Sequence, residues 1–134
     1  MKKDIVPPIV EDIALAIVRE LNEQSQWEWN AYLLNLKNEI IEGVLVTSRG
    51  YGFYDGKEVK TSTLRHFLDT IPSKGYSKVE PILETLFGLN NEYWVSFYLN
   101  KIMYDKKYVF LAESIREEYA IQIPLLNKKG VMIK

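Results

Sequence analysis

The sequence contains no cysteine, which excludes disulfide bonds, thiol nucleophiles and thiolate metal sites. It has one histidine, His66, too few for a two-metal centre built from paired Glu-x-x-His motifs. An excess of charge is also missing, because 17 Lys and Arg residues oppose 18 Asp and Glu residues. No net basic field therefore draws the chain to nucleic acid or to an anionic membrane surface.

Long hydrophobic runs are lacking as well. A membrane-spanning helix needs about 20 predominantly apolar residues, and charged residues interrupt this chain well before that length. The first residues fail as a secretion signal, because Pro7 and Pro8 interrupt them and Glu11 and Asp12 follow. We therefore expect a cytoplasmic protein that does not associate with membranes.

The chain has 134 residues, of which 47% are hydrophobic and 26% are charged. This composition is typical of a globular protein rather than a disordered one. The length suits one domain over residues 1–134. No phosphate-cradling Gly-x-x-x-x-Gly-Lys segment is present, so the sequence indicates no nucleotide and no other cofactor.

Apolar residues near the N-terminus recur at spacings of three and four: Ile9, Val10, Ile13, Ala14, Ile17 and Leu21. This period places them on one face of a helix, which we expect over residues 8–22. Two short helices are expected in the middle of the chain. One covers residues 64–71, and the other begins at the capping-box pattern Ser77-Lys-Val-Glu80 and ends near Gly88.

Aromatic and β-branched residues predict strands elsewhere. Segments 27–36 and 40–47 are too close for a helical crossover, so we expect them to pair as a hairpin. Asp55-Gly56 predicts a tight turn. Further strands are expected at 93–99 and 108–112, with a turn near 105–107, and at 119–123 and 131–133. The expected fold is α+β: an antiparallel sheet of about five to seven strands, an N-terminal helix and two short middle helices.

The segment Arg49-Gly-Tyr51-Gly-Phe53 resembles the start of a signature of RNA-recognition domains, in which aromatic rings stack unpaired bases. Residues 32–36 are similar to the partner segment of that family. The resemblance implies binding of single-stranded nucleic acid through Tyr51 and Phe53. However, the family places a helix and a strand between the two segments, and residues 37–48 are too few for both. Nucleic-acid binding is therefore the least favoured function.

Catalytic and metal sites are not indicated. On a helix, Ser62, His66 and Asp69 would share one side, as a nucleophile, a base and an orienting acid do. The sequence offers no oxyanion site to accompany them, so we assign no catalytic residue. Glu80 and Glu84 lack histidine partners for a metal. Whether the protein is an enzyme stays open, and catalysis is the less favoured alternative.

The unusual feature is the aromatic content, with 9 Tyr, 5 Phe and 3 Trp. Tyr and Trp are enriched at the cores of interfaces. We expect a binding protein that acts through an aromatic sheet face, forms a homodimer and is able to engage another protein. The alternative is a small-molecule site or a minor enzyme, in a cleft between sheet and helices. The candidate binding residues are Trp27, Trp29, Arg49, Tyr51, Phe53, Trp94 and Tyr98.

Overall fold

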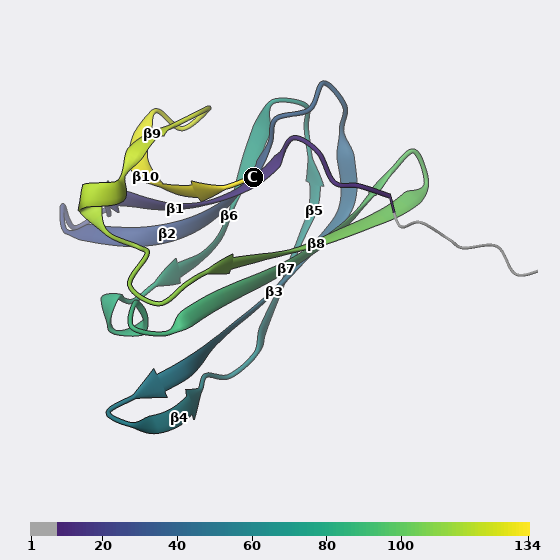
Figure 1. Ribbon diagram of the computed structural model, residues 1–134. Coiled ribbons are helices and arrows are strands. Elements are labelled where there is room, and N and C mark those ends of the chain that lie inside the picture. The colour runs from purple at the N-terminus through teal and green to yellow at the C-terminus, as the bar shows by residue number, and fades with distance from the viewer. Residues whose placement is uncertain (1–7) are drawn as a thin grey trace, which may run out of the picture.

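Two antiparallel sheets form the body of the protein in the computed structural model, which describes residues 8–134 (Figure 1). The opening segment, examined above for a secretion signal, lies outside these residues apart from Pro8. The strands are β1 (Ile13–Leu21), β2 (Trp27–Asn35), β3 (Ile41–Tyr54), β4 (Lys57–Lys60), β5 (Leu64–Ile71), β6 (Gly75–Ile82), β7 (Asn90–Leu99), β8 (Ile102–Phe110), β9 (Ile121–Ile123) and β10 (Lys128–Ile133). The expected α+β class is therefore wrong, because the fold is almost entirely β.

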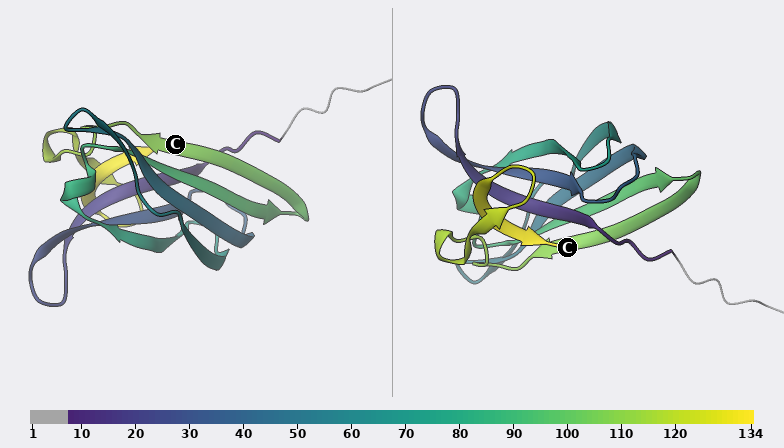
Figure 2. Two further views of the ribbon diagram at one scale, coloured as in Figure 1. Left: turned by 90° about the horizontal axis from the view of Figure 1, so that it is seen from below. Right: turned by 90° about the horizontal axis from the view of Figure 1, so that it is seen from above.

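One sheet, sheet A, has the strand order β6-β2-β1-β10-β9. The other, sheet B, has the order β4-β3-β7-β8, and β5 also pairs with β3. The chain passes from sheet A to sheet B between β2 and β3 and returns between β5 and β6. It crosses again between β6 and β7 and returns between β8 and β9. Figure 2 shows the two layers from above and below, with the β7–β8 hairpin extending beyond them. Core side chains from both sheets fill the space between them.

The predicted helix over residues 8–22 is wrong, because Ile13–Leu21 is the central strand β1. Every residue from position 13 to position 18 is buried. Ile13, Leu15 and Ile17 face the core between the sheets, whereas Ala14 and Ala16 join a second cluster on the outer face of sheet A. An unbroken apolar run contains the spacing of a helix face as well as that of a buried strand, so the pattern alone does not separate the two. Here the run is apolar throughout because β1 is buried on both faces.

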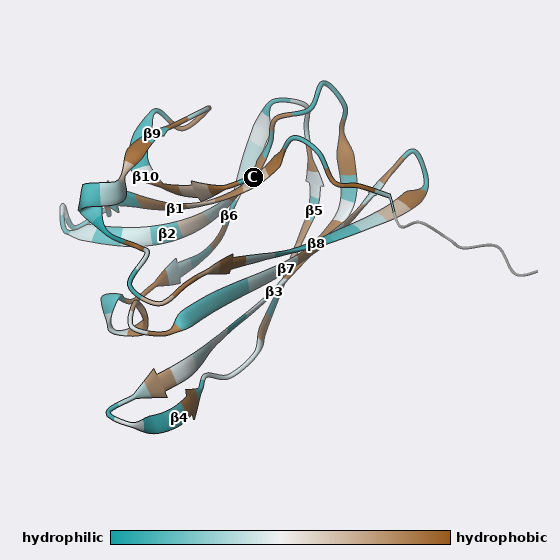
Figure 3. Ribbon diagram, in the orientation of Figure 1, coloured by the Kyte–Doolittle hydropathy of each residue, from teal (hydrophilic) through white to brown (hydrophobic). Residues whose placement is uncertain are grey.

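The chain around β9 covers that outer face of sheet A. Ile123, Leu125 and Leu126 pack against alanines 14 and 16 in the second cluster. A single helical turn, η2 (Glu117–Tyr119), precedes β9. Figure 3 shows η2 as hydrophilic beside the more hydrophobic β1. The described helical segments, η1 (Glu84–Leu86) and η2, are single turns, and neither could cross a membrane.

The two predicted middle helices are also wrong. Residues 64–71 form β5, and the Ser77–Glu80 pattern lies within β6 rather than capping a helix. Only the short turn η1 falls inside the second predicted helix. Pro81 fits β6 because this strand is at the edge of sheet A, where a missing ladder donor is tolerated.

The turn predictions have mixed outcomes. The Asp55-Gly56 turn is confirmed: it joins β3 to β4, and both residues have positive φ, 53° and 76°. Segments 27–36 and 40–47 do not pair, because they enter different sheets. Strands β7 and β8 pair as expected, but they turn at Asn100 and Lys101, both of positive φ, rather than near 105–107. Strands β9 and β10 do pair, but through residues 128–130, whereas residues 131–133 pair with β1. Pro124 follows the end of β9.

Candidate functional site

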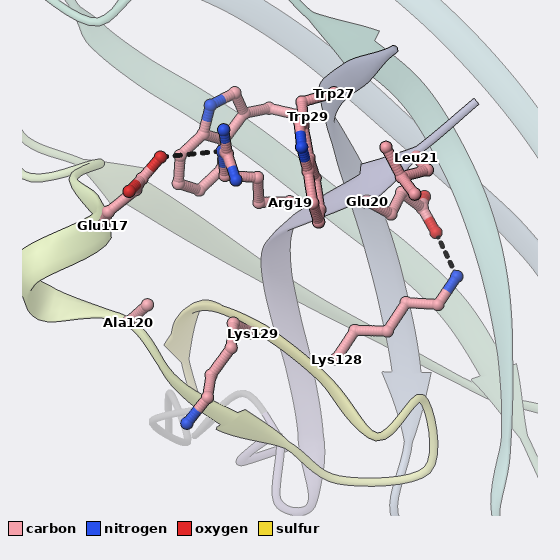
Figure 4. Close-up of a pocket in the computed structure, with 9 residues that line it drawn as sticks. All are labelled: Arg19, Glu20, Leu21, Trp27, Trp29, Glu117, Ala120, Lys128 and Lys129. Atoms are coloured by element: carbon pink, nitrogen blue, oxygen red, sulfur yellow. Dashed lines mark hydrogen bonds and ion pairs between the residues drawn. The ribbon is translucent and has the colours of Figure 1, made fainter. Parts of the chain in front are cut away.

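A hollow opens where β10 separates from β1. The two strands pair only as far as Val18 and Gly130, and the preceding residues of β10, Lys128 and Lys129, pair with β9 instead. The resulting cavity of about 640 Å³ lies at one end of sheet A, beside η2 (Figure 4). We call it the Trp pocket. It is lined by Arg19, Glu20, Leu21, Trp27, Trp29, Glu117, Ala120, Lys128 and Lys129.

Arg19 links two walls of the Trp pocket. The Cζ atom of its guanidinium lies 4.3 Å from the ring centroid of Trp27, in a cation–π contact. Its Nε lies 2.8 Å from Oε1 of Glu117, which comes from η2. The arginine side chain is 29% exposed, so most of it is removed from solvent. These contacts hold the guanidinium plane against the Trp27 ring and hold η2 near β1.

Trp29 forms a rigid part of the wall. It is 4% exposed, whereas Trp27 is 58% exposed, although both come from β2. The indole Nε1–H of Trp29 donates to Oε1 of Glu84, with 3.1 Å between the two atoms. Its ring also makes an edge-to-face contact with Phe87 at a centroid distance of 5.4 Å. Trp29 therefore belongs to both the core and the pocket.

Glu20 is the buried carboxylate of the Trp pocket. Its Oε2 accepts hydrogen bonds from Tyr32 Oη and Asn30 Nδ2, each at 2.7 Å, and its Oε1 lies 2.6 Å from Lys128 Nζ. Burial by itself would raise the pKa of this carboxyl group, but the three donors outweigh burial and lower the pKa. Burial and the bond to Glu20 raise the pKa of the Tyr32 phenol. Glu20 is therefore ionised, and both of its carboxylate oxygens are bonded to neighbouring side chains.

The remaining charges of the Trp pocket favour a negative ligand group. Both carboxylates already have a cation, since Glu20 is paired with Lys128 and Glu117 with Arg19. Lys129 is exposed and forms no ion pair with residues 8–134. Figure 4 shows it at the mouth of the pocket, extending away from the tryptophans. One unpaired cation therefore borders the cavity.

The structure places the predicted binding residues in three regions, of which the second and third adjoin. Trp27 and Trp29 line the Trp pocket. Arg49, Tyr51 and Phe53 line a second hollow of about 480 Å³ near the β3–β4 hairpin. There the guanidinium of Arg49 lies 5.4 Å from the Tyr51 ring, and its Nε lies 2.9 Å from Oε2 of Glu92.

Trp94 and Tyr98 occupy the third region, the outer face of sheet B. They are 45% and 48% exposed. Because alternate residues of a strand point to opposite faces, Trp94 and Tyr98 share one face of β7. Trp94 lies opposite Lys107 of β8. This face is separate from the Trp pocket, whereas Arg49 borders it, because Arg49 lies opposite Glu92 of β7 and is bonded to it.

The hypothetical Ser62–His66–Asp69 alignment does not form. It requires a helix, and the segment is the strand β5 and the residues before it. His66 instead contacts Glu80 of β6. The alternative of a cleft between sheet and helices also needs correction, because the described residues contain only single helical turns. The Trp pocket lies between strands and the η2 turn.

A larger hollow of about 900 Å³ lies between the β2–β3 connection and the β7–β8 turn. Its one aromatic ring is Tyr98, and the loop residues around it are mostly exposed. The Trp pocket is smaller but has two indole rings, a buried carboxylate and walls held by ion pairs. Preformed ligand sites contain a few positioned polar groups of this kind, so the Trp pocket is the stronger candidate.

Most polar residues of the Trp pocket could not be identified from the sequence. A helix over residues 8–22 places Arg19 away from the apolar face, whereas β1 places it beside Trp27. Glu117 and Lys128 reach the pocket from the far end of the chain, and no sequence spacing signals that approach. Comparisons with known protein families, with curated proteins and with solved structures find no match for this chain.

Proposed function

We propose that this protein binds a small amphipathic molecule in the Trp pocket. The observation that carries the proposal is a cavity of about 640 Å³ walled by two indole rings and bordered by fixed charges. Ligand sites of proteins are commonly clefts of about 300–1,000 Å³ with apolar walls and a few positioned polar groups. The Trp pocket agrees with that description in size and in lining.

Preorganisation of the walls supports the same proposal. Trp29 is fixed by its bond to Glu84, Glu20 by three donors, and Arg19 by Trp27 and Glu117. A ligand entering such a site has little side-chain ordering to impose, which removes part of the entropic cost of binding. These side chains are therefore arranged before any ligand arrives.

A neutral fluorescent probe tests the proposal. N-phenyl-1-naphthylamine fluoresces strongly only in apolar surroundings, and we expect it to bind the protein saturably. Ala120 lines the Trp pocket and is half-buried, so Ala120→Phe fills part of the cavity and is expected to reduce probe affinity at least about tenfold, or about 1.4 kcal/mol.

Ala112→Phe is the matched control. Ala112 is exposed after β8 and lines none of the hollows described here, so the same substitution there leaves the cavity unchanged. Circular dichroism checks that both variants fold. If the probe does not bind, or if Ala120→Phe and Ala112→Phe bind it equally, the Trp pocket is not the binding site.

Self-association through the outer face of sheet B is a second candidate function. Trp94, Tyr98, Phe67 and Met103 are each between 45% and 67% exposed. Charges of both signs accompany them, since Glu92 lies near Lys107 and Asp105 lies opposite Ser96 on the same face. A second copy of the chain would therefore present complementary charges and rings to this surface.

Light scattering after gel filtration tests self-association. The candidate expects a particle of twice 15.7 kDa whose population falls on dilution. Trp94→Ser is expected to favour the monomer, because it removes the largest exposed ring of the face. A monomer at every accessible concentration would exclude this candidate and leave the Trp pocket proposal unaffected.

A further inference from the structure

The geometry points to the ligand class of the Trp pocket: a molecule with a flat apolar body and one singly charged oxyanion, a carboxylate or sulfonate, held by Arg19. This inference rests on the proposed function, since it assumes that the pocket binds a ligand. It adds which residue recognises the ligand and which charge the ligand carries.

The stacking of Arg19 decides which of its groups are free. A guanidinium that stacks on an aromatic ring uses its flat face and leaves its N–H donors pointing outward in the plane. Here the Trp27 ring lies 4.3 Å from Cζ, and Glu117 approaches at Nε. Glu117 is the only acidic partner of Arg19 among residues 8–134, and it leaves the two terminal nitrogens for another acceptor. A two-oxygen anion fits this pair of donors.

The charge balance limits the ligand to a single negative charge. The lining has three cations, Arg19, Lys128 and Lys129, and two carboxylates, Glu20 and Glu117, which leaves one positive charge in excess. The two carboxylates are paired with Arg19 and Lys128, so the excess charge is that of Lys129 at the mouth (Figure 4). A monoanion neutralises that excess. A dianionic phosphate would carry surplus charge beside two carboxylates in a partly desolvated site, where repulsion is weakly screened.

The flat body follows from the apolar part of the lining. Trp29, Leu21 and Ala120 are apolar residues of the lining (Figure 4). Trp29 is 4% exposed and fixed in the core, so the part of its ring that lines the cavity is a rigid apolar surface. Aromatic rings gain from offset or edge-to-face contacts with such a surface in addition to burial of area.

Two probes with the same rings separate this inference from the proposed function. 8-Anilinonaphthalene-1-sulfonate carries the ring system of N-phenyl-1-naphthylamine together with one sulfonate. Arg19→Met keeps an unbranched side chain against Trp27 but removes the charge. We expect it to weaken binding of the sulfonate probe about tenfold or more, because charge-assisted bonds are lost, and to leave the neutral probe within about twofold. Arg65→Met, at an exposed position of β5, is the matched control and is expected to change neither.

Glu117→Gln provides a test of opposite sign. Glu117 is 67% exposed, so its replacement leaves the fold intact and serves if Arg19→Met fails to fold. Without that carboxylate the guanidinium is released and the repulsion of an anion is removed. We expect the sulfonate probe to bind about twofold to fivefold more tightly, because a single exposed charge interaction contributes little free energy. The affinity of the neutral probe is expected to stay unchanged.

The outcomes are distinguishable. If neither probe binds in the Trp pocket, the proposed function fails and this inference fails with it. A second outcome is that the neutral probe binds and Ala120→Phe blocks it, but neither Arg19→Met nor Glu117→Gln changes the affinity of the sulfonate probe. In that case the proposed function is supported, and the assignment of an anionic ligand is overturned. Opposite shifts of the sulfonate probe in the two variants, against an unchanged neutral probe, support it.

Discussion

Nε2 of His66 lies 2.6 Å from Oε1 of Glu80, and this contact joins β5 of sheet B to β6 of sheet A. The same Oε1 accepts a hydrogen bond from Ser48 Oγ at 2.7 Å, and Tyr93 Oη lies 3.4 Å from Oε2. Burial, followed by the charge of Glu80, raises the pKa of the Tyr93 phenol. The single histidine therefore belongs to a polar link between the sheets.

Glu80 is expected to matter more for stability than His66. Glu80→Ala leaves three donors without their acceptor and is expected to lower the free energy of unfolding by about 3 kcal/mol, whereas His66→Ala removes one donor and is expected to cost about 1–2 kcal/mol. Urea denaturation measures both. The double variant gives the coupling energy, and strictly additive losses would show that the two residues do not act together.

Glu20 is expected to make stability depend on pH in the acid range. Its pKa in the folded protein is below the ordinary value of 4.5, so the unfolded chain binds more protons as pH falls through this range. The stabilisation is therefore present above about pH 4.5 and is lost progressively below it. Glu20→Gln is expected to be less stable at neutral pH, with a difference from the wild type that narrows on acidification.

Urea denaturation at several pH values checks this expectation. Glu23→Gln is the control, because Glu23 is exposed in the loop between β1 and β2 and has no ion pair among the described residues. A constant difference between Glu20→Gln and wild type from neutral to acid pH would contradict the assigned direction of the pKa shift.

Gly130 is expected to tolerate no side chain. A β-carbon there would overlap the carbonyl oxygen of Ile17 and lie 3.0 Å from Cα of Val18, both backbone atoms of β1. Because backbone cannot rotate away, Gly130→Ala is expected to cost about 1–3 kcal/mol of unfolding free energy. Gly88→Ala is the control, since its nearest neighbour is the Glu113 side chain at 3.5 Å, and it is expected to change stability by less than about 0.5 kcal/mol. Thermal unfolding of the two variants compares them.

The fold could be predicted from the sequence only where local chemistry decides it. Asp55-Gly56 determines its turn because both positions need positive φ. The residues of β1 carry no such local signal. Their burial on two faces depends on Leu125 and Leu126, which come from the other end of the chain. A continuous apolar run was therefore compatible with a helix until its partners were known.

The candidate site was predictable in its aromatic part alone. Trp27 and Trp29 could be placed on one strand face from their spacing. Their polar neighbours could not, because Glu20 and Lys128 are 108 residues apart. Such contacts depend on strand order, and β10 lies beside β1 for reasons that no short motif contains. Identifying the residue types was possible, but assembling them required the sheet topology.

Trp27 and Trp29 share one face of β2, but their replacement is expected to have different effects. Trp29→Ala is expected mainly to destabilise the fold, and Trp27→Ala mainly to weaken binding of the anionic probe. Trp29 is buried, bonded to Glu84 and packed on Phe87, so Trp29→Ala is expected to cost about 3–5 kcal/mol of unfolding free energy. Trp27 is 58% exposed and stacks with Arg19, so Trp27→Ala is expected to cost less than about 1 kcal/mol of unfolding free energy.

Trp27→Ala is expected to affect binding of the sulfonate probe more than it affects stability. Trp27→Ala removes the surface that orients the Arg19 guanidinium, so the folded variant is expected to bind the sulfonate probe about threefold to tenfold more weakly. Fluorescence titration measures this, with urea denaturation of the same sample as the stability reference. A stable Trp27→Ala variant with unchanged affinity would show that stacking on Trp27 does not orient Arg19 for the anion.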